Sequence, residues 1–163
     1  PPYAYRCPLG SASDTECGER SARHIGRTID EYGSGQVAAV LMEPDAGTNG
    51  IIAPDSYWPL LRRETRDRGV WLIADEVMSG FGRCGEWFAW QRYGEAGRPD
   101  LMSLAKGLTG SHLPLGAVVM SREVAARLET AYPAIAVVPG VEMISGGAGV
   151  ASPHMPIPRS PFS

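Results

Sequence analysis

The stretch VWLIADEVMSGFGR (Val70–Arg83) joins an apolar run to two adjacent acids and then to a glycine-rich segment. The run is rich in aromatic and β-branched residues, which is typical of a buried strand. Asp75 and Glu76 follow at once, and a carboxylate at the end of such a strand is costly to bury unless a positive group meets it. The stretch therefore predicts a strand whose terminal acids need a positive partner.

Three further apolar runs of strand length lie along the chain. They are VAAVLM (37–42), LMSLA (101–105) and GAVVM (116–120). Helical patterns and turns separate these runs, and uniformly apolar strands are typical of parallel sheets. The alternation predicts an α/β fold with a mostly parallel sheet.

Three helices are expected, one before the first strand, one between strands and one after the last strand. The mixed polar stretch Glu16–Tyr32 predicts a solvated helix that ends at Gly33. Asp55 is a good N-cap for a second helix, which extends to about Arg68. Its inward-facing apolar residues are Trp58, Leu60 and Leu61. The third predicted helix covers residues 122–129.

Composition limits the classes of partner. The chain has 163 residues, 44% of them hydrophobic and 20% charged, which suits one globular domain or a large piece of one. A net charge of −3 gives no reason to expect nucleic acid or an anionic membrane as a partner. No run of about 18 apolar residues and no secretory leader is visible. Cys7, Cys17 and Cys84 form no even disulfide framework, so reduced thiols in a cytoplasmic protein are expected.

The two ends of the sequence indicate a fragment. The chain begins with Pro1-Pro2 instead of methionine. The segment 132–163 is rich in proline, glycine and serine, and it sustains no helical or strand period. We expect residues 1–131 to form part of a larger domain and 132–163 to be an irregular or disordered tail.

Three chemically useful side chains follow predicted strands. Glu43, Asp75 and Lys106 stand at or just after strand ends, where parallel sheets gather their ligands. Lys106 is the only lysine in the chain. A lysine that is partly desolvated at such a place loses its proton more readily and can form a Schiff base. Asp75 can hold a protonated ring nitrogen, so the pair suits the aldehyde and pyridinium of pyridoxal 5′-phosphate (PLP).

Simpler readings of the two residues remain open. Lys106 can extend to the surface like most lysines, and Asp75 can form a salt bridge to one of the many arginines. Neither residue alone therefore predicts PLP chemistry.

Three segments together resemble the class III aminotransferases, which are PLP enzymes of fold type I. They are MEPDAGTNG (42–50), LIADEVMSGFGRCGEWFA (72–89) and RPDLMSLAKGLTGSHLPLGAVVMS (98–121). The resemblance covers roughly residues 5–129 and implies part of the large domain of that fold. GTNG and Met78 resemble the ω-aminotransferases, which move an amino group from an amine or ω-amino acid to a keto acid such as pyruvate.

The resemblance also implies roles for individual residues. Lys106 would form the Schiff base with PLP and shuttle a proton, and Asp75 would keep the pyridine nitrogen protonated. Val77 would pack against the ring, and Glu43 would lie near cofactor and substrate. Glu76 would support the following loop. The family is typically a homodimer with active sites at the subunit interface.

The turn Gly80–Arg83 matches a family motif and is interpreted as architecture, since glycines allow tight folding. Arg83 is alternatively a ligand for a substrate carboxylate. The four tryptophans are expected to be packing groups, with Trp87 and Phe88 as alternative pocket-lining residues.

Parts of the family pattern are missing. The family's phosphate-binding segment and ring-stacking aromatic precede the matched region, and TAYPAIAVVPGVEMISGG (130–147) does not match its G-x-T segment. Met78-Ser79 stands where many members have glutamine. A truncated, catalytically inactive aminotransferase remnant is therefore the alternative function.

Two other enzyme classes share pieces of the pattern. VWLIADE also matches the Walker B strand of a P-loop ATPase, but no G-x-x-x-x-G-K-[ST] loop accompanies it. Ser103 to Lys106 spells the S-x-x-K motif of penicillin-binding enzymes, without S-D-N or K-T-G. His24, His112 and His154 stand far apart, so no metal site is predicted.

Overall fold

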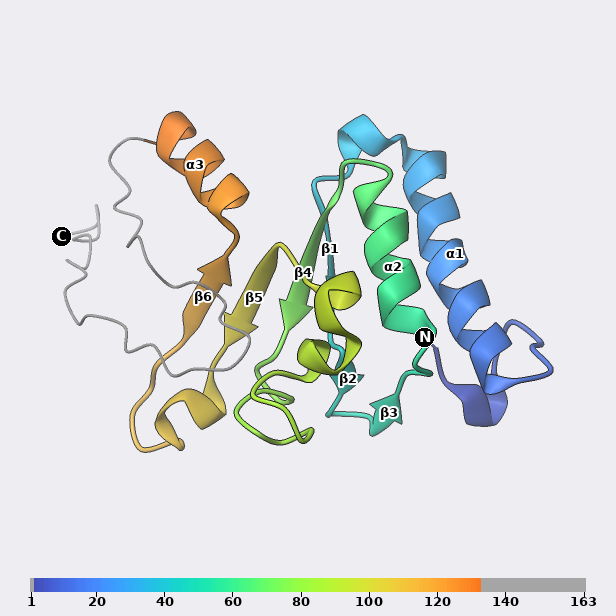
Figure 1. The fold of residues 1–163 in the computed structure, drawn as a ribbon, viewed down its shortest axis with the longest axis horizontal. Helices are drawn as coiled ribbons and strands as arrows, with labels where there is room; N and C mark the ends of the chain where they lie inside the picture. The colour runs from blue at the N-terminus through green and yellow to red at the C-terminus, as the bar shows by residue number, and fades with distance from the viewer. Residues whose placement is uncertain (1, 133–163) are drawn as a thin grey trace, which may run out of the picture. The chain divides into compact units, whose positions relative to one another are not determined.

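The central sheet carries three parallel strands and one antiparallel edge strand in the order β1-β4-β5-β6 (Figure 1). Its strands are β1 (Ala39–Met42), β4 (Trp71–Asp75), β5 (Leu101–Leu104) and β6 (Ala117–Met120). The computed structural model describes residues 2–132. All four strands lie where apolar runs predicted them, and the α/β fold with a mostly parallel sheet is confirmed.

A second, two-stranded sheet follows β1. It pairs β2 (Asp45–Ala46) antiparallel with β3 (Ile51–Ile52). No strand was predicted here, because strands of two residues leave no alternation to read. Gly50 has a φ of +62°, as its place in the connecting turn requires.

Helix α1 (Asp14–Tyr32) begins two residues before the predicted start. The side chain of Ser13 accepts a hydrogen bond from the Glu16 amide, and the Glu16 carboxylate accepts one from the Ala12 amide at 2.7 Å. Such reciprocal bonds satisfy amides that the first helical turn leaves without partners. The helix ends at Gly33 as expected, with a φ of +85°.

The expectation of a solvated α1 is wrong for one of its faces. Gly18, Ala22 and Gly26 recur every four residues and are buried. A Cβ atom at Gly18 would overlap the Ser56 hydroxyl, and one at Gly26 would overlap the Glu64 carboxylate. This face packs closely against another helix through small residues, which carry little hydrophobic signal in the sequence.

That other helix is α2 (Tyr57–Arg66), which lies between α1 and β4 (Figure 1). The predicted N-cap at Asp55 is wrong, because the helix starts after Ser56. The Tyr57 amide already donates to the Pro54 carbonyl at 2.8 Å, so it needs no side-chain cap. The predicted inward-facing residues Trp58, Leu60 and Leu61 are buried.

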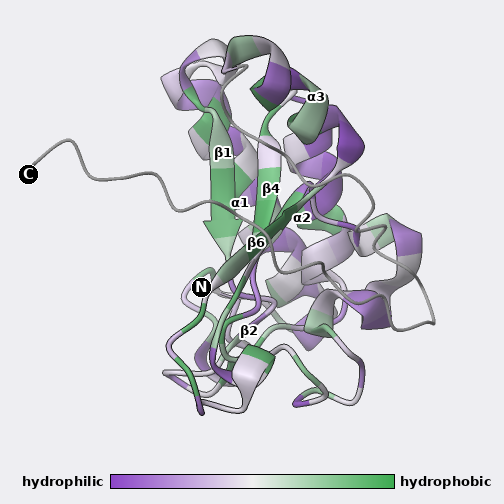
Figure 2. Cartoon of the chain, turned by 90° about the vertical axis from the view of Figure 1, so that its left-hand side faces the viewer, coloured by the Kyte–Doolittle hydropathy of each residue, from purple (hydrophilic) through white to green (hydrophobic). Residues whose placement is uncertain are grey.

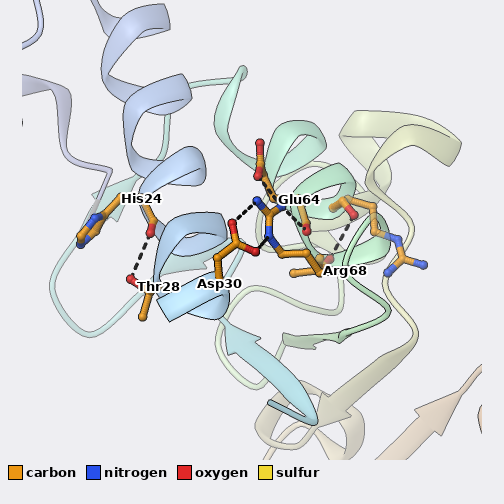
Figure 3. Close-up of polar contacts among 7 residues, drawn as sticks. His24, Thr28, Asp30, Glu64 and Arg68 are labelled. Atoms are coloured by element: carbon orange, nitrogen blue, oxygen red, sulfur yellow. Dashed lines mark hydrogen bonds and ion pairs between the residues drawn. The ribbon is translucent and has the colours of Figure 1, made fainter. Parts of the chain in front are cut away.

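Arg68 joins the ends of these two helices (Figure 3). Its guanidinium donates two hydrogen bonds to Asp30 at 2.7 and 2.8 Å and one to Glu64 at 2.7 Å. The pairing with Arg68 lowers the pKa of the Asp30 carboxyl. Because Asp30 is largely exposed, the ion pair fixes geometry more than it adds stability.

A buried ion pair joins α2 to the start of β5. Arg62 donates to both carboxylate oxygens of Asp100 at 2.6 and 2.7 Å, and both residues are more than nine-tenths buried. The same carboxylate accepts the Leu72 amide of β4 at 2.8 Å. Asp100 thus links a helix to two neighbouring strands.

The two faces of the sheet differ in burial. Register places Leu72, Ala74, Met102 and Leu104 on one face, and all four are buried. Helices α1 and α2 lie on the same side of β1 and β4 in Figure 1, and Figure 2 colours much of β1 and β6 as hydrophobic. On the opposite face, Leu41 of β1 and Val118 of β6 are each 60% exposed.

The remaining elements are short, apart from one helix. The structure has 3-10 segments at Ala4–Arg6, Ser34–Gln36, Ala89–Gly97 and Lys106–Thr109. Helix α3 (Arg122–Ala131) falls in a second unit of the chain and extends slightly past its predicted range. Except for Tyr132, the predicted tail lies outside the described residues. No helix in the described part of the chain is both long and apolar enough to span a membrane.

The environments of Cys7 and Cys84 predict different thiol reactivity. The Cys7 thiol has a hydrogen bond with the thiol of Cys17 near the start of α1. The bond from Cys17 lowers the pKa of Cys7 to about 7, whereas burial raises the pKa of Cys84 to about 11. The Cys7 thiolate therefore forms above about pH 7, while Cys84 stays a thiol. We expect iodoacetamide to alkylate Cys7 with a midpoint near pH 7 and well before Cys84, as measured by peptide mass spectrometry. Equal rates at pH 7.5 would contradict this.

Candidate active site

The three predicted strand-end residues lie along one edge of the sheet. Glu43 directly follows β1, Asp75 ends β4 and Lys106 comes two residues after β5. Because β1, β4 and β5 are parallel neighbours, their carboxyl ends meet at that edge. Within residues 2–132 no hydrogen bond or ion pair joins any two of the three side chains. The edge therefore presents an acid and an amine that do not neutralise each other.

Asp75 is half-buried and keeps one carboxylate oxygen available. Its Oδ1 accepts the Val77 amide at 3.0 Å and the Ser103 hydroxyl at 3.1 Å. Among the described residues, Oδ2 has no hydrogen-bond partner. These two hydrogen bonds fix the orientation of the carboxylate, while Oδ2 can accept a hydrogen bond from another group.

Sequence reasoning missed the part played by Ser103. The residue pairs in register with Asp75 on the neighbouring strand, so both side chains lie on the face opposite the buried Leu72 and Ala74. Parallel register is not readable from two separate apolar runs, and Ser103 drew notice only through the S-x-x-K spelling.

Lys106 has an unusual backbone conformation. Its φ is +44°, in the left-handed region that residues other than glycine seldom adopt. The Ser111 amide donates to its carbonyl at 3.0 Å and closes the turn behind it. The residue is exposed, so the expected partial desolvation is wrong for the described chain. Within residues 2–132, Val118 on the neighbouring edge strand is exposed as well.

Glu43 holds the loop after β1. Its carboxylate accepts the Gly47 amide at 3.1 Å. A Cβ atom at Gly47 would lie 2.8 to 2.9 Å from side-chain atoms of Met78, so that loop packs directly on the segment after β4. Val77 is half-buried beside Asp75, and its contact with a cofactor ring stays a prediction.

Glu76 supports the loop that follows β4, as the sequence predicted. The residue is fully buried, and its carboxylate accepts the amides of Ala89 and Trp90 at 3.0 Å each. The Ser79 hydroxyl donates a third, short hydrogen bond. Burial raises the pKa of Glu76 even though these donors favour its charged form. Its donors are backbone amides and a hydroxyl, not an arginine or lysine.

The glycine turn after Glu76 is architectural, as expected. A Cβ atom at Gly80 would lie 2.8 Å from the Glu76 carbonyl oxygen, and Gly82 has a φ of +87°. Arg83 is exposed, and its binding of a substrate carboxylate stays a prediction. Trp87 is 63% exposed, so the expectation that all four tryptophans are packing groups is wrong for Trp87.

An ion pair close to the loop after β1 was not predicted from the sequence. Arg92 donates to both oxygens of Asp45 at 2.6 and 2.7 Å, and its guanidinium also lies over the Tyr93 ring. The partners are 47 positions apart, and the many arginines gave no reason to select Arg92. Arg92, which lies close to the loop after β1, is therefore already paired with an acid.

The residues present fit part of a PLP molecule. The available Oδ2 of Asp75 can accept a hydrogen bond from a pyridinium N–H, and Lys106 supplies the only side-chain amine in the sequence that can condense with an aldehyde. No cluster of three or more His, Cys, Asp or Glu side chains within residues 2–132 could hold a metal ion. Asp75 and Lys106 together suit an organic cofactor that has an N–H group at one end and an aldehyde at the other.

Comparison with known proteins identifies the family. The family model for class-III aminotransferases matches residues 2–134. The chain belongs to the class III aminotransferases. These are PLP-dependent enzymes, which agrees with the resemblance in the sequence.

Individual aminotransferases are similar over the same region. The chain is 46% identical over 116 residues to the putrescine–pyruvate aminotransferase of Pseudomonas aeruginosa, covering 71% of this chain and 25% of that protein. It is 43% identical over 125 residues to the diaminobutyrate–2-oxoglutarate aminotransferase of Rhizobium meliloti, covering 75% and 26%. The chain thus spans about a quarter of the length of these curated relatives.

Solved structures of transaminases share the fold. An (S)-enantioselective ω-transaminase from Thermomicrobium roseum superimposes with a TM-score of 0.74 at 39% identity, covering 81% of this chain and 29% of that chain. A PLP-bound amine transaminase from an uncultivated Pseudomonas species gives 0.73 at 36% identity, covering 78% and 29%. These likenesses confirm the predicted fold type I architecture.

Proposed function

We propose that this class III aminotransferase chain carries the lysine and aspartate of a PLP-dependent transaminase. The intact protein would move an amino group from an amine or ω-amino acid to a keto acid. The observation that carries the proposal is the edge formed by β4 and β5. There Asp75 keeps a free carboxylate oxygen and the only lysine of the chain follows the neighbouring strand.

Bound PLP would supply an aldehyde that takes up the amino group and a pyridinium ring that accepts electrons. Lys106 would provide the amine that captures the aldehyde, and its Nζ would then carry the proton moved at the substrate carbon. Asp75 would hold the proton on the ring nitrogen through Oδ2, while Val77 and Ser103 fix its other oxygen. Val77 would contact the ring, and Glu43 would lie near the substrate.

The substrate class rests on the named relatives. One relative pairs putrescine with pyruvate, another pairs diaminobutyrate with 2-oxoglutarate, and a Caulobacter vibrioides relative is an ω-aminotransferase at 40% identity. The amino groups of putrescine are carried on terminal carbons. We therefore favour a terminal amine as donor and a small keto acid as acceptor, in a cytoplasmic enzyme.

Exposed apolar side chains support a homodimer. Trp87, Leu113 and Leu115 are 63%, 68% and 55% exposed, and the last two belong to the loop after Lys106. Apolar groups beside a polar edge are typical of surfaces that another chain covers. A second subunit would also remove water from Lys106, which is exposed in the chain alone.

Trapping with borohydride tests the proposal. The chain is incubated with excess PLP and reduced, so that any bond between an amine and the cofactor becomes permanent, and the label is mapped by mass spectrometry. Nα-acetyl-lysine added to the reaction serves as a reference amine, and the chain unfolded in guanidinium serves as the control. We expect the ratio of Lys106 label to Nα-acetyl-lysine label to be roughly tenfold or more higher with the folded chain. An equal ratio would favour the inactive remnant.

Replacing Asp75 by asparagine is expected to weaken PLP binding while leaving capture by Lys106 possible. Asparagine preserves an acceptor for Val77 and Ser103 but presents an amide donor where the pyridinium needs an acceptor. Loss of a hydrogen bond to a charged group predicts roughly 10- to 100-fold weaker binding, measured by quenching of tryptophan fluorescence. The matched control is Asp55→Asn, an exposed acid on a turn. Equal affinities of the two variants would remove Asp75 from the cofactor site.

A further inference from the structure

Phe81 combines a rare backbone conformation with a defined place in the loop after β4. Its φ is +62°, although glycines stand on both sides of it. Its amide donates to the Trp87 carbonyl at 2.6 Å. A bulky residue in the left-handed region persists only where surrounding structure enforces it, and such residues concentrate at functional sites.

The surrounding structure that enforces it begins at Glu76. The carboxylate of Glu76 binds the Ala89 and Trp90 amides, which places Phe88 directly before the held backbone. The Phe88 ring meets the Phe81 ring edge-on, with centroids 5.6 Å apart. A buried acid thus fixes one aromatic ring, and that ring packs against Phe81.

On its other side, Phe81 contacts the residue after the lysine. A Cβ atom at Gly107 would lie 2.9 Å from both Cβ and Cδ2 of Phe81. The Phe81 side chain therefore occupies the space above the Lys106–Gly107 peptide. Lys106 itself is left-handed, with a φ of +44°. The contact therefore joins one residue with a positive φ to the immediate neighbour of another.

We propose that Phe81 is a positioning residue for Lys106. By packing on Gly107, the ring keeps the Lys106 backbone in its left-handed conformation and so directs the amine toward the edge where Asp75 lies. The inference rests on the proposed function, because it concerns the same lysine. It adds a role for a loop residue that has no charged or nucleophilic group.

The test compares two reactions of the only lysine. Trapping by PLP and borohydride requires Lys106 to be oriented toward the cofactor, whereas acetylation by acetic anhydride requires only an accessible amine. We expect Phe81→Ala and Gly107→Ala to slow PLP trapping roughly ten- to hundredfold and to leave acetylation unchanged. Phe81→Leu, which keeps an apolar side chain at that position, should restore most of the trapping rate. Tyr32→Ala, at an exposed aromatic on α1, is the control.

A double variant tests whether the two residues act through their contact. Phe81→Gly removes the three atoms that lie nearest to a Cβ at position 107, and glycine tolerates the left-handed φ. Adding Gly107→Ala to Phe81→Gly should therefore slow trapping much less than Gly107→Ala does alone. Far-UV circular dichroism of each variant identifies any that fails to fold.

The outcomes separate the inference from the proposed function. A wild-type chain whose Lys106 is trapped no faster than in the unfolded chain contradicts the proposed function. A wild-type chain with fast trapping, together with folded Phe81→Ala and Gly107→Ala variants that trap equally fast, contradicts only the positioning role. Parallel losses of trapping and acetylation in folded variants would also overturn it, because they would indicate burial of the amine instead of misdirection.

Discussion

Replacing Lys106 by alanine is expected to abolish capture of PLP by any side chain of this chain. The chain has no other lysine, so no second side-chain amine can substitute for it. The amine is both nucleophile and proton carrier in the proposed reaction, and its removal eliminates two steps at once. The measurement is borohydride trapping followed by peptide mapping, with no label expected on any side chain.

The variant Lys106→Ala/Arg98→Lys is the matched control, because it tests whether a lysine at another position is trapped as fast as Lys106. It keeps one lysine, moved to an exposed position where Arg98 now pairs with Glu95. We expect this lysine to be trapped no faster than Lys106 in the unfolded wild-type chain, since it lies away from the edge that carries Asp75. Trapping as fast as in the wild type would mean that Lys106 is an ordinary surface amine.

The strands were predictable because their signal is local. Each apolar run is bounded by glycine, proline or charged residues, and burial of such runs in a sheet is the dominant energetic choice. Once β1, β4 and β5 are parallel neighbours, Glu43, Asp75 and Lys106 must come to one edge. The composition of the site was therefore readable from residues that directly follow the strands.

Contacts between distant segments were not predictable in the same way. Ser103 reaches Asp75 only because β4 and β5 pair in one particular register. The contact of Phe81 with Gly107 depends on where two loops end, which no period in either loop encodes. Register and loop geometry are set by packing across the whole sheet. A single sequence names candidate residues, but it does not give their partners.

The errors in burial have one physical origin. Sequence patterns rank residues by hydrophobicity, whereas burial depends on what covers them. The small residues of α1, such as Gly18 and Ala22, are buried because α2 lies against them. Trp87 and Lys106 are exposed in the described chain, which spans only about a quarter of its relatives.

Replacing Arg62 by leucine is expected to cause the largest loss of stability of any single substitution described above. Arg62 and Asp100 are each more than nine-tenths buried, and Arg62 binds both carboxylate oxygens. Without Arg62, the Leu72 amide is the one remaining hydrogen-bond donor to the buried Asp100 carboxylate among the described residues. Removing one partner of a buried pair costs about 3–5 kcal/mol, which approaches the whole stability of many small domains. Urea unfolding followed by tryptophan fluorescence measures the loss.

Two further variants decide whether the buried charge is the cause. Arg98→Leu removes an arginine from an exposed ion pair, and we expect its stability to change by less than about 1 kcal/mol. Arg62→Leu/Asp100→Asn also removes the buried charge, while the amide oxygen of asparagine can still accept the Leu72 amide. The double variant should therefore be more stable than Arg62→Leu alone. If it is equally unstable, the loss comes from the packing of Arg62 instead of from a charge left without its partner.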